Sequence, residues 1–470
     1  MFEDINRFGR QTALCVDENA ISYEDFCNLS EEIAEAVTNR SLVFLLCQNR
    51  KAAITGYIGF IKNHIVPVMI DAEMDSQLLE NLMRIYRPAY FWLPSALAFR
   101  YPFYEKIFEK DDYVLLSTHE KNPFPLHQDL ALLMTTSGST GSPKFVRISY
   151  RNIESNTNSI IQYLHMTEKE RGITNLPIHY VYGLSIVNTH LLIGASLVVT
   201  EKSLFQRDFW QLVEQQNVSN LAGVPYTYTM MERLRFFRMN LPNLRTLTQA
   251  GGKLDVALHR KFASYAMENN KRFIVMYGAA EATARMGYLP SEVSLDKCGA
   301  MGIAIPGGRF ELIDEEGGIV NENDIPGELV YYGENVSMGY AERGADLILG
   351  DERGGRLETG DIATCDADGY YTIVGRKKRF LKVFGKRINL QEVEQLIREN
   401  YEDADVACAG MDDHIYVFLT KEWNVGDVKH FLSTKMGIHP TALFVKRIQE
   451  IPKNSSGKII YRELERYYDI

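Results

Sequence analysis

The stretch Thr135-Thr136-Ser137-Gly138-Ser139-Thr140-Gly141-Ser142-Pro143-Lys144 is the most informative part of this 470-residue chain. Its first eight residues are all Gly, Ser or Thr. The apolar run Leu130–Met134 precedes them, and Phe145–Ile148 alternates as a strand does. Glycines let backbone N–H groups turn toward an anion, hydroxyls donate further hydrogen bonds, and lysine supplies positive charge. The order strand, hydroxyl-rich loop, lysine, strand therefore predicts a cradle for a polyphosphate group.

This loop is not a Walker A motif, which needs Gly directly before the Lys, Ser or Thr directly after it, and then a helix. Here Pro143 precedes Lys144 and Phe145 follows it. On composition alone a flexible Gly/Ser linker fits the loop equally well. The flanking strands and the terminal lysine favour the cradle.

Composition excludes several classes of protein. With 51 basic and 61 acidic residues the net charge is −10, so we expect no broad attraction to nucleic acid or to an anionic membrane. The six cysteines are scattered without a C-x-x-C pair, which favours a reducing compartment over a zinc or disulfide framework. The N-terminus lacks the features of a signal peptide, and no apolar run approaches the roughly 20 residues that span a bilayer. We expect a cytoplasmic protein without a membrane span.

Helix and strand patterns alternate over more than half of the chain. Tyr23–Thr38 and Ala52–Ile61 read as helices, and Leu42–Leu46 and Ile65–Ile70 read as buried strands. Similar units continue to about residue 276, which predicts an α/β fold with largely parallel sheets covered by helices. Ligands in such sheets collect beyond the carboxyl ends of the strands, and Gly138 and Gly278 each follow a predicted strand.

The pattern changes after about residue 295. Short strands interrupted by glycines, such as Arg309–Ile313 and Glu328–Tyr332, predict an antiparallel, barrel-like β region. From about residue 378 a small α+β unit begins, with helices over Leu390–Asn400 and Val425–Met436. We therefore predict a large N-terminal domain of α/β sheets plus a barrel-like β region, residues 1–377. A small mobile C-terminal α+β domain would follow, residues 378–470.

Four further segments carry groups suited to ATP. The segment Tyr277-Gly278-Ala279-Ala280-Glu281 follows a strand and offers a ring for a base and a carboxylate for Mg²⁺. Thr359-Gly360-Asp361 offers a carboxylate for ribose hydroxyls, and Gly375-Arg376 offers a guanidinium for phosphate or ribose. Pro452–Lys458 has the composition of a mobile loop that carries a lysine. Each segment alone is more typical of plain surface than of a binding site.

Together, in this order and spacing, these segments resemble the adenylate-forming superfamily of acyl-CoA synthetases, peptide-synthetase adenylation domains and luciferases. The resemblance extends from about Arg10 to Leu464. Its further marks are L-P-I-H-Y-V-Y-G (176–183), A-G-G (250–252), G-E-L-V (327–330), G-R-K-K-R-F-L-K-V-F-G-K-R-I (375–388) and S-G-K (456–458).

The resemblance implies a two-step ligase. A carboxylate attacks the α-phosphorus of ATP, pyrophosphate leaves, and an acyl-adenylate remains. A thiol then takes the acyl group, and the protein contributes positioning and charge stabilisation. The implied cofactors are ATP, Mg²⁺ and either CoA or the phosphopantetheine of a carrier protein, and the implied substrate is a small carboxylic acid.

The resemblance also implies residue roles. Glu281 would bind Mg²⁺, and Lys458 would bridge the attacking carboxylate and the ribose side of the adenylate. Lys378 would be the hinge that lets the small domain rotate after the first step, and Gly385 would lie in the turn that admits pantetheine. The pyrophosphate cradle would be Thr136, Ser137, Gly138, Ser139, Thr140, Gly141 and Lys144. The rest of the nucleotide would be held by Gly251, Tyr277, Gly278, Ala279, Ala280, Asp361 and Arg376.

Three positions depart from the family pattern. Phe145 replaces the Gly that usually follows the loop lysine, and Ala280 replaces the Thr that usually precedes the magnesium Glu. By this resemblance we expect the missing hydroxyl to weaken transition-state binding by about 1–2 kcal/mol, or about tenfold in rate, without abolishing catalysis. Tyr180 stands where the family usually has His, with His179 displaced by one position.

The substrate is less well defined by the sequence. Relatives that activate amino acids carry an Asp for the α-amine, and alignment with their pattern places Val181 there. A buried ammonium without a counter-charge is costly, so a non-amino acid is favoured: a fatty, aryl or other small acid. The candidate pocket walls are Tyr180, Tyr182, Gly183, Val224, Pro225, Tyr226 and Gly252.

Three hypotheses follow. The first is a ligase that passes its acyl group to CoA, and the second is a ligase that loads a carrier protein or an amine. The third, suggested by Ala280 and Phe145, is a catalytically weakened nucleotide-binding protein. Lys458 argues against the third, because a binding protein has no need of it.

Overall fold

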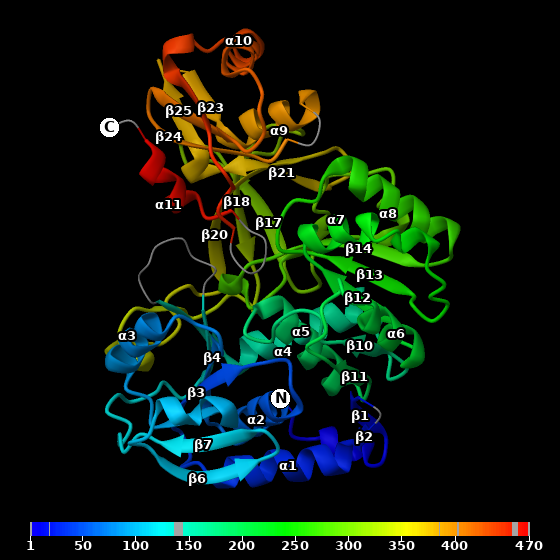
Figure 1. The fold of residues 1–470 in the computed structure, drawn as a ribbon, viewed down its shortest axis with the longest axis vertical. Coiled ribbons are helices and arrows are strands. Elements are labelled where there is room, and N and C mark those ends of the chain that lie inside the picture. Colours follow the sequence, from blue (N-terminus) through cyan, green and yellow to red (C-terminus); the bar gives the residue numbers. More distant parts are fainter. Residues whose placement is uncertain are drawn as a thin grey trace. The chain divides into compact units, whose positions relative to one another are not determined.

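The computed structural model describes residues 2–17, 19–135, 144–384, 386–401, 404–453 and 459–468 (Figure 1). These residues form two compact units. The larger unit contains the described residues of 2–135, 144–310 and 331–357, and the smaller contains those of 311–330 and 358–468. Within these ranges no helix combines the length and the apolar character needed to cross a bilayer.

The first sheet of the larger unit has eight strands in the order β19-β9-β8-β4-β3-β5-β7-β6. Its centre, β8-β4-β3-β5, is parallel, and antiparallel strands complete both edges. Strand β3 is buried at every position, which explains its continuous apolar sequence. The bounds are β3 Leu42–Cys47, β4 Val66–Asp71, β5 Tyr90–Pro94, β6 Glu105–Lys110, β7 Tyr113–Ser117, β8 Leu130–Thr135, β9 Phe145–Ser149 and β19 Gly339–Ala341.

Two smaller sheets complete the larger unit, in the orders β10-β11-β1-β2 and β12-β13-β14-β15-β16. Strands β12, β13 and β14 are parallel, and β15 and β16 continue antiparallel. The bounds are β1 Thr12–Val16, β2 Asn19–Ser22, β10 Arg171–Ile173, β11 Ser196–Val199, β12 Asn220–Gly223, β13 Thr246–Gln249, β14 Arg272–Tyr277, β15 Gly287–Leu289 and β16 Ile303–Ala304.

The helices of the larger unit begin where the sequence supplies caps. Ser22 caps α1 by accepting a 3.0 Å hydrogen bond from the backbone N–H of Asp25, and Ser149 with Asn152 forms a capping box on α4. In Figure 1, α7 and α8 lie on one side of strands β12–β14, and α4 and α5 lie on the other. The bounds are α1 Tyr23–Glu35, α2 Lys51–Lys62, α3 Ser76–Tyr86, α4 Tyr150–Tyr163, α5 Val181–Leu192, α6 Arg207–Gln215, α7 Pro225–Arg233 and α8 Val256–Glu268.

The C-terminal part of the chain has its own hydrophobic core, built around Val393, Ile397, Val417 and Leu432. A four-stranded sheet, β17-β18-β20-β21, precedes the hairpin β22-β23 and the sheet β24-β25-β26. The strand bounds are β17 Arg309–Ile313, β18 Gly327–Tyr332, β20 Arg356–Cys365, β21 Tyr371–Arg376, β22 Phe380–Val383, β23 Lys386–Asn389, β24 Val406–Met411, β25 His414–Leu419 and β26 Leu443–Arg447. The helices are α9 Leu390–Asn400, α10 Val425–Met436 and α11 Tyr461–Leu464.

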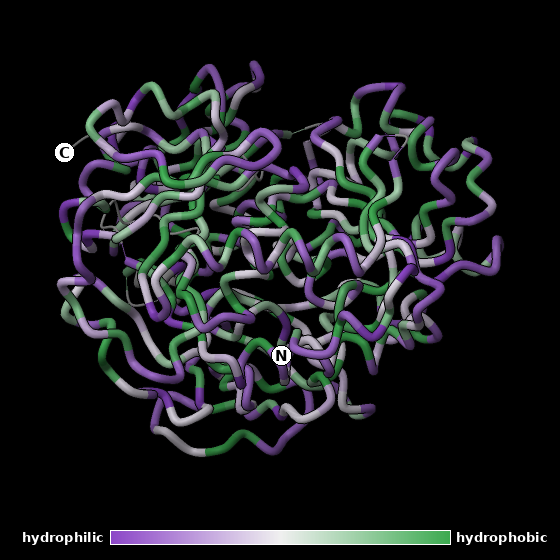
Figure 2. Tube along the Cα trace, turned by 90° about the horizontal axis from the view of Figure 1, so that it is seen from below, coloured by the Kyte–Doolittle hydropathy of each residue, from purple (hydrophilic) through white to green (hydrophobic). Residues whose placement is uncertain are grey.

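The predicted α/β fold is confirmed, with helices α9 and α10 at their predicted bounds. The sequence analysis missed the hairpin β6–β7 and the short buried strand β13. Exposed and half-exposed residues dominate β6, and β13 is only four residues long, so neither gives a clear apolar period. Figure 2 shows hydrophobic stretches recurring between hydrophilic turns along the trace. The domain boundary at residues 377 and 378 remains a prediction.

Candidate active site

The hydroxyl-rich loop joins two neighbouring strands of one sheet. Strands β8 and β9 pair antiparallel, with Thr135 opposite Phe145. The loop therefore connects a hairpin, which argues against the alternative of a linker between domains. Lys144 is described, whereas the other predicted cradle residues, Thr136, Ser137, Gly138, Ser139, Thr140 and Gly141, lie outside the described residues.

Lys144 and the predicted magnesium ligand Glu281 both contact the same tyrosine, Tyr340. The Nζ of Lys144 is 4.0 Å from the centre of the Tyr340 ring, and the Tyr340 hydroxyl donates a 2.6 Å hydrogen bond to Oε1 of Glu281. The guanidinium of Arg353 is 4.8 Å from the same ring. One carboxylate and two cations thus surround one phenol, an arrangement suited to a metal ion with phosphate oxygens.

The acidity of Tyr340 reflects this environment. Burial and the nearby negative charge of Glu281 raise the pKa of Tyr340 to about 12, and Arg353 partly opposes the shift. The phenol therefore stays protonated near neutral pH and remains a donor to the carboxylate. Nη1 of Arg353 is buried and has no hydrogen-bond partner among the described residues, so an anionic ligand could bind there. The sequence analysis missed both Tyr340 and Arg353.

The segment after β14 holds the predicted nucleotide residues, at the carboxyl end of a parallel strand as expected. The Tyr277 ring lies 6.4 Å from that of Phe310. A Cβ on Gly278 would lie 1.8 Å from the carbonyl oxygen of Ala284, so only glycine fits there. Ala279 precedes the 3₁₀ turn Ala280–Ala282 as its N-cap.

The structure shows what surrounds the residues that depart from the family pattern, and what Thr283 near Ala280 contacts. Phe145 is buried in a hydrophobic core and packs on Tyr86, with 4.7 Å between ring centres. Ala280 packs against the main core of the larger unit. The Thr283 hydroxyl donates a 2.7 Å hydrogen bond to the Asn335 carbonyl oxygen. His179 faces Asp71, with 3.7 Å between Nε2 and Oδ2, and burial lowers its pKa despite this carboxylate.

Several predicted substrate-pocket residues converge. Gly251 has φ +88°, and a Cβ on it would lie 2.8 Å from the Tyr180 hydroxyl and 3.2 Å from Val224. A Cβ on Gly252 would lie 3.2 Å from Pro225. Tyr180, Val224 and Gly251 therefore form one contact. Gly183 touches the Pro177 carbonyl, and the half-exposed Tyr226 lies 6.2 Å from Phe205.

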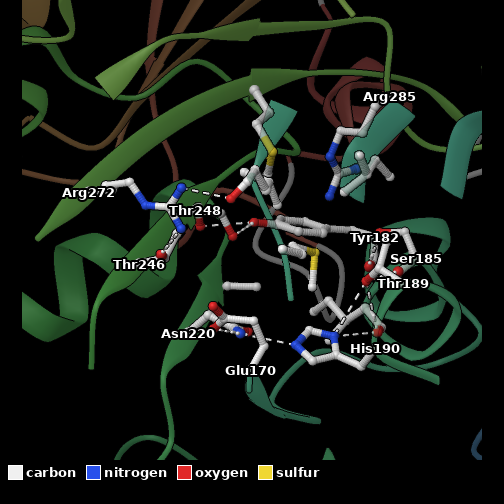
Figure 3. A pocket seen from close by; sticks show the side chains of 16 residues that line it. Glu170, Tyr182, Ser185, Thr189, His190, Asn220, Thr246, Thr248, Arg272 and Arg285 are labelled. Atoms are coloured by element: carbon white, nitrogen blue, oxygen red, sulfur yellow. Dashed lines mark hydrogen bonds between the residues drawn. The ribbon is translucent and has the colours of Figure 1, made fainter. Parts of the chain in front are cut away.

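Tyr182 lies deeper and lines a cavity of about 40 Å³ between α4, α5 and strands β12–β14 (Figure 3). Its hydroxyl donates a 2.8 Å hydrogen bond to the Thr248 carbonyl oxygen. Burial raises the pKa of Tyr182 to about 12, and the positive charge of Arg285 partly opposes the shift. Of the predicted pocket residues only Tyr182 lines this cavity. The polar residues around it that the sequence analysis missed are Glu170, Ser185, Thr189, His190, Asn220, Thr246, Thr248, Arg272 and Arg285.

The smaller unit contains a second pair of predicted residues. Asp361 on β20 and Arg376 on β21 are register partners, with 2.7 Å between Oδ1 and Nε. The Asp361 side chain is 7% exposed and that of Arg376 is 64% exposed. The Thr359 hydroxyl accepts a 3.1 Å hydrogen bond from the Asp361 backbone N–H. The carboxylate is thus held in place beside a guanidinium that solvent can reach.

The remaining predicted residues of the smaller unit are less fully described. Lys378 belongs to the 3₁₀ turn Lys377–Arg379, but its side chain lies outside the described part. Gly385 and Lys458 also lie outside the described residues. Their predicted roles stay predictions.

Comparison with known proteins identifies the family. The family model described as AMP-binding enzyme matches residues 1–341. The long-chain-fatty-acid–CoA ligase of Yersinia pestis is 28% identical over 398 residues, which is 80% of this chain and 66% of that protein. The 2-succinylbenzoate–CoA ligase of Bacillus subtilis is 23% identical and aligns over 96% of this chain and 94% of its own length.

The fold agrees with that of a solved relative. The O-succinylbenzoate coenzyme A synthetase of Bacillus subtilis, solved in complex with AMP, superposes with a TM-score of 0.80 at 19% identity, covering 99% of this chain and 97% of that one. At this identity the likeness establishes the fold. The predicted membership of the adenylate-forming superfamily is confirmed: this chain belongs to the AMP-binding enzyme family.

Proposed function

We propose that this protein is an AMP-forming acid–thiol ligase, which joins a carboxylic acid to AMP with release of pyrophosphate and then transfers the acyl group to the thiol of CoA. The observation that carries the proposal is the cluster of Lys144, Tyr340, Glu281 and Arg353 next to strand β9, where Tyr340 pairs with Val146. The family relatives named above are CoA ligases of different acids, which supports the reaction class and leaves the acid open.

The cluster fits ATP and Mg²⁺. Among the residues described here, no group of three or more His, Cys, Asp or Glu side chains could hold a metal ion. Mg²⁺ in phosphoryl-transfer sites is usually held by one or two carboxylates together with phosphate oxygens, so a single Glu281 is sufficient. Lys144 and Nη1 of Arg353, which has no hydrogen-bond partner among the described residues, would bind phosphate oxygens. Bound Mg²⁺ would neutralise part of the negative charge on the phosphates.

The other predicted roles form part of the proposal. Asp361 would hold the ribose hydroxyls, and Arg376 would brace the ribose or a phosphate. Lys458 would balance the charge of the attacking carboxylate, and Gly385 would admit the pantetheine arm. The small domain from residue 378, with its hinge at Lys378, would rotate between the two steps. Tyr180 and Val224 would form part of the wall around the acyl group, next to Gly251 of the nucleotide site.

The test is ATP-dependent pyrophosphate release over a panel of fatty, aryl and short-chain acids, with and without CoA. Lys458→Ala should abolish release. A matched control is Lys453→Ala, which removes a nearby lysine paired with Asp405 at 2.9 Å. That half-exposed pair contributes no more than about 1 kcal/mol, so this variant should keep its activity.

The outcomes separate the hypotheses. Turnover that requires CoA supports the proposal. Pyrophosphate release without acyl transfer to CoA favours a carrier protein or an amine as acceptor. Binding of ATP without release by any acid would overturn the ligase proposal and favour a nucleotide-binding protein.

A further inference from the structure

A buried arginine lines the cavity that also contains Tyr182, one of the predicted acyl-pocket residues. Arg285 is 3% exposed and lies four residues after Glu281, in the segment that joins β14 to β15. Figure 3 shows its guanidinium above the ring of Tyr182, with His190 and Asn220 at the opposite end of the cavity. One short segment therefore carries both the predicted magnesium ligand and a cation that lines the cavity.

The guanidinium of Arg285 is incompletely satisfied. Its Nη1 donates a 3.1 Å hydrogen bond to the Ala284 carbonyl oxygen, and its Cζ lies 3.9 Å from the centre of the Tyr182 ring. A side-chain hydrogen bond joins it to Tyr163. Its Nε is buried and has no hydrogen-bond partner in the part of the chain that the structure describes. Over the described ranges, no carboxylate forms an ion pair with Arg285.

The other charged groups around the cavity have partners. Arg272 donates from Nη1 to the Leu164 carbonyl oxygen at 2.7 Å and from Nη2 to the Thr246 hydroxyl at 2.8 Å. Glu170 pairs with Arg245, with 3.1 Å between Oε1 and Nη2. His190 is bonded through both ring nitrogens, to the Ile186 carbonyl and to Asn220, and burial lowers its pKa. Arg285 therefore differs from these groups, because its Nε alone has no hydrogen-bond partner within the described residues.

An anionic ligand group could supply a hydrogen-bond acceptor and a counter-charge for Arg285. A buried charge without a counter-charge carries a desolvation penalty of several kcal/mol, and an opposite charge offsets it. The cavity of about 40 Å³ has room for about three water molecules, which is close to the size of one carboxylate group. A guanidinium matches a carboxylate in geometry as well as in charge.

The backbone at Arg285 is fixed in advance. Its carbonyl oxygen accepts hydrogen bonds from Nδ2 of Asn156 at 2.9 Å and from Nδ2 of Asn335 at 2.7 Å. Thr283, two residues earlier, adopts φ +65° and is bonded to the Asn335 carbonyl. A side chain on a backbone held this firmly loses little further freedom when a ligand binds.

We propose that the acid activated by this protein carries a second carboxylate, and that Arg285 binds this second carboxylate in the cavity lined by Tyr182. The inference rests on the proposed ligase function and specifies its substrate class as dicarboxylic acids. The first carboxylate reacts at the nucleotide, and the second forms an ion pair with the guanidinium.

The test compares pairs of acids that differ only in the second carboxylate: glutarate with valerate, adipate with hexanoate, and phthalate with benzoate. Pyrophosphate release is measured for the wild type, Arg285→Leu and Arg285→Lys. The wild type should prefer at least one diacid over its matched monoacid. Arg285→Leu should lower kcat/KM for that diacid by about 100-fold, because the diacid would lose its buried ion-pair partner. The same substitution should leave kcat/KM for the monoacid unchanged or raise it. Arg285→Lys should keep part of the preference.

Arg272→Lys is the matched control, since Arg272 lines the same cavity but bonds to the protein. This variant should show the same diacid-to-monoacid ratio of kcat/KM as the wild type. If monoacids drive release and Arg285→Leu leaves the diacid-to-monoacid ratio of kcat/KM unchanged, this inference is overturned. The ligase proposal then still stands.

If no acid drives release, the ligase proposal fails, and binding then decides the inference. The midpoint of thermal unfolding is measured with each diacid present. A diacid that raises the midpoint of the wild type but not that of Arg285→Leu supports the anion site. Equal shifts in the two proteins, or no shift in either, overturn it.

Discussion

The hydroxyl of Tyr340 donates a 2.6 Å hydrogen bond to Oε1 of Glu281, across 59 residues of sequence. Lys144 and Arg353 lie over the same tyrosine ring. The phenol therefore contacts the carboxylate through its hydroxyl and the two cations through its ring. Under the proposed function, this arrangement would let Glu281 bind a divalent ion and let the two cations bind phosphate.

Removal of that hydroxyl should weaken the use of magnesium. A hydrogen bond to a charged group contributes about 1.5–3 kcal/mol, so Tyr340→Phe should lower kcat/KM for ATP by about tenfold to a hundredfold at limiting Mg²⁺. Saturating Mg²⁺ should restore part of the loss, because Glu281 itself remains. The measurement is pyrophosphate release over a series of Mg²⁺ concentrations. Tyr332→Phe serves as the control, and a Tyr340→Phe profile that matches the wild type would refute the role.

The ribose role of Asp361 predicts discrimination between nucleotides. If its carboxylate binds a ribose hydroxyl, 2′-deoxy-ATP or 3′-deoxy-ATP should be used about tenfold less well than ATP by the wild type. Asp361→Asn should use ATP poorly and lose much of this discrimination. Steady-state kinetics with the three nucleotides tests the prediction. Asp368→Asn, which alters an exposed carboxylate of the same unit, should behave as the wild type does.

Ala280 offers a gain-of-function test. Ala280→Thr restores the hydroxyl that the family usually carries and should raise the adenylation rate by about tenfold. Ala280→Val adds a side chain of similar volume without the hydroxyl, so it should bring no gain. Single-turnover formation of the acyl-adenylate measures both variants. Equal rates for the two would mean that the hydroxyl makes no contact with the transition state.

His259 should make the fold sensitive to acid. Burial lowers the pKa of this histidine from 6.5 to about 4, while its ring bonds to the Ser294 hydroxyl at 3.0 Å and to the Gly299 N–H at 3.2 Å. Between these two pH values the unfolded chain binds a proton that the folded chain does not, so stability falls as pH falls. The difference corresponds to about 3 kcal/mol, present above pH 6.5 and lost toward pH 4.

Urea unfolding at pH 7, 6, 5 and 4 measures this loss. His259→Gln should show a shallower decline in the free energy of unfolding than the wild type. His430→Gln, on the exposed surface of α10, should decline as the wild type does. Parallel curves for all three proteins would assign the acid sensitivity to other groups.

Much of this protein could be predicted from its sequence. The spacing of apolar residues predicted helices such as α9 and α10. The motifs around Lys144, Glu281 and Asp361 predicted the family. These signals are local, since a helix period or a glycine-rich loop is determined by neighbouring residues. The strands β6 and β13 were missed because one is mostly exposed and the other is short.

Arg285 and Arg353 show where prediction from sequence stops. In the sequence Arg353 lies in the charged run Asp351-Glu352-Arg353-Gly354-Gly355-Arg356, which reads as surface. Arg285 interrupts the small and apolar run Ala282–Met286, and this was the one available signal of a buried cation.

The sequence by itself determined the order of the elements, the hairpin loop with its lysine and the carboxylates suited to ATP, because each depends on residues that are close along the chain. Only the tertiary structure decided that Tyr340 reaches Glu281 and that Nε of Arg285 has no hydrogen-bond partner among the residues that the structure describes. The environment of a buried charge is set by distant segments that pack around it. Asn156, Tyr182 and Asn335 all contact Arg285, and none of them is its neighbour in sequence.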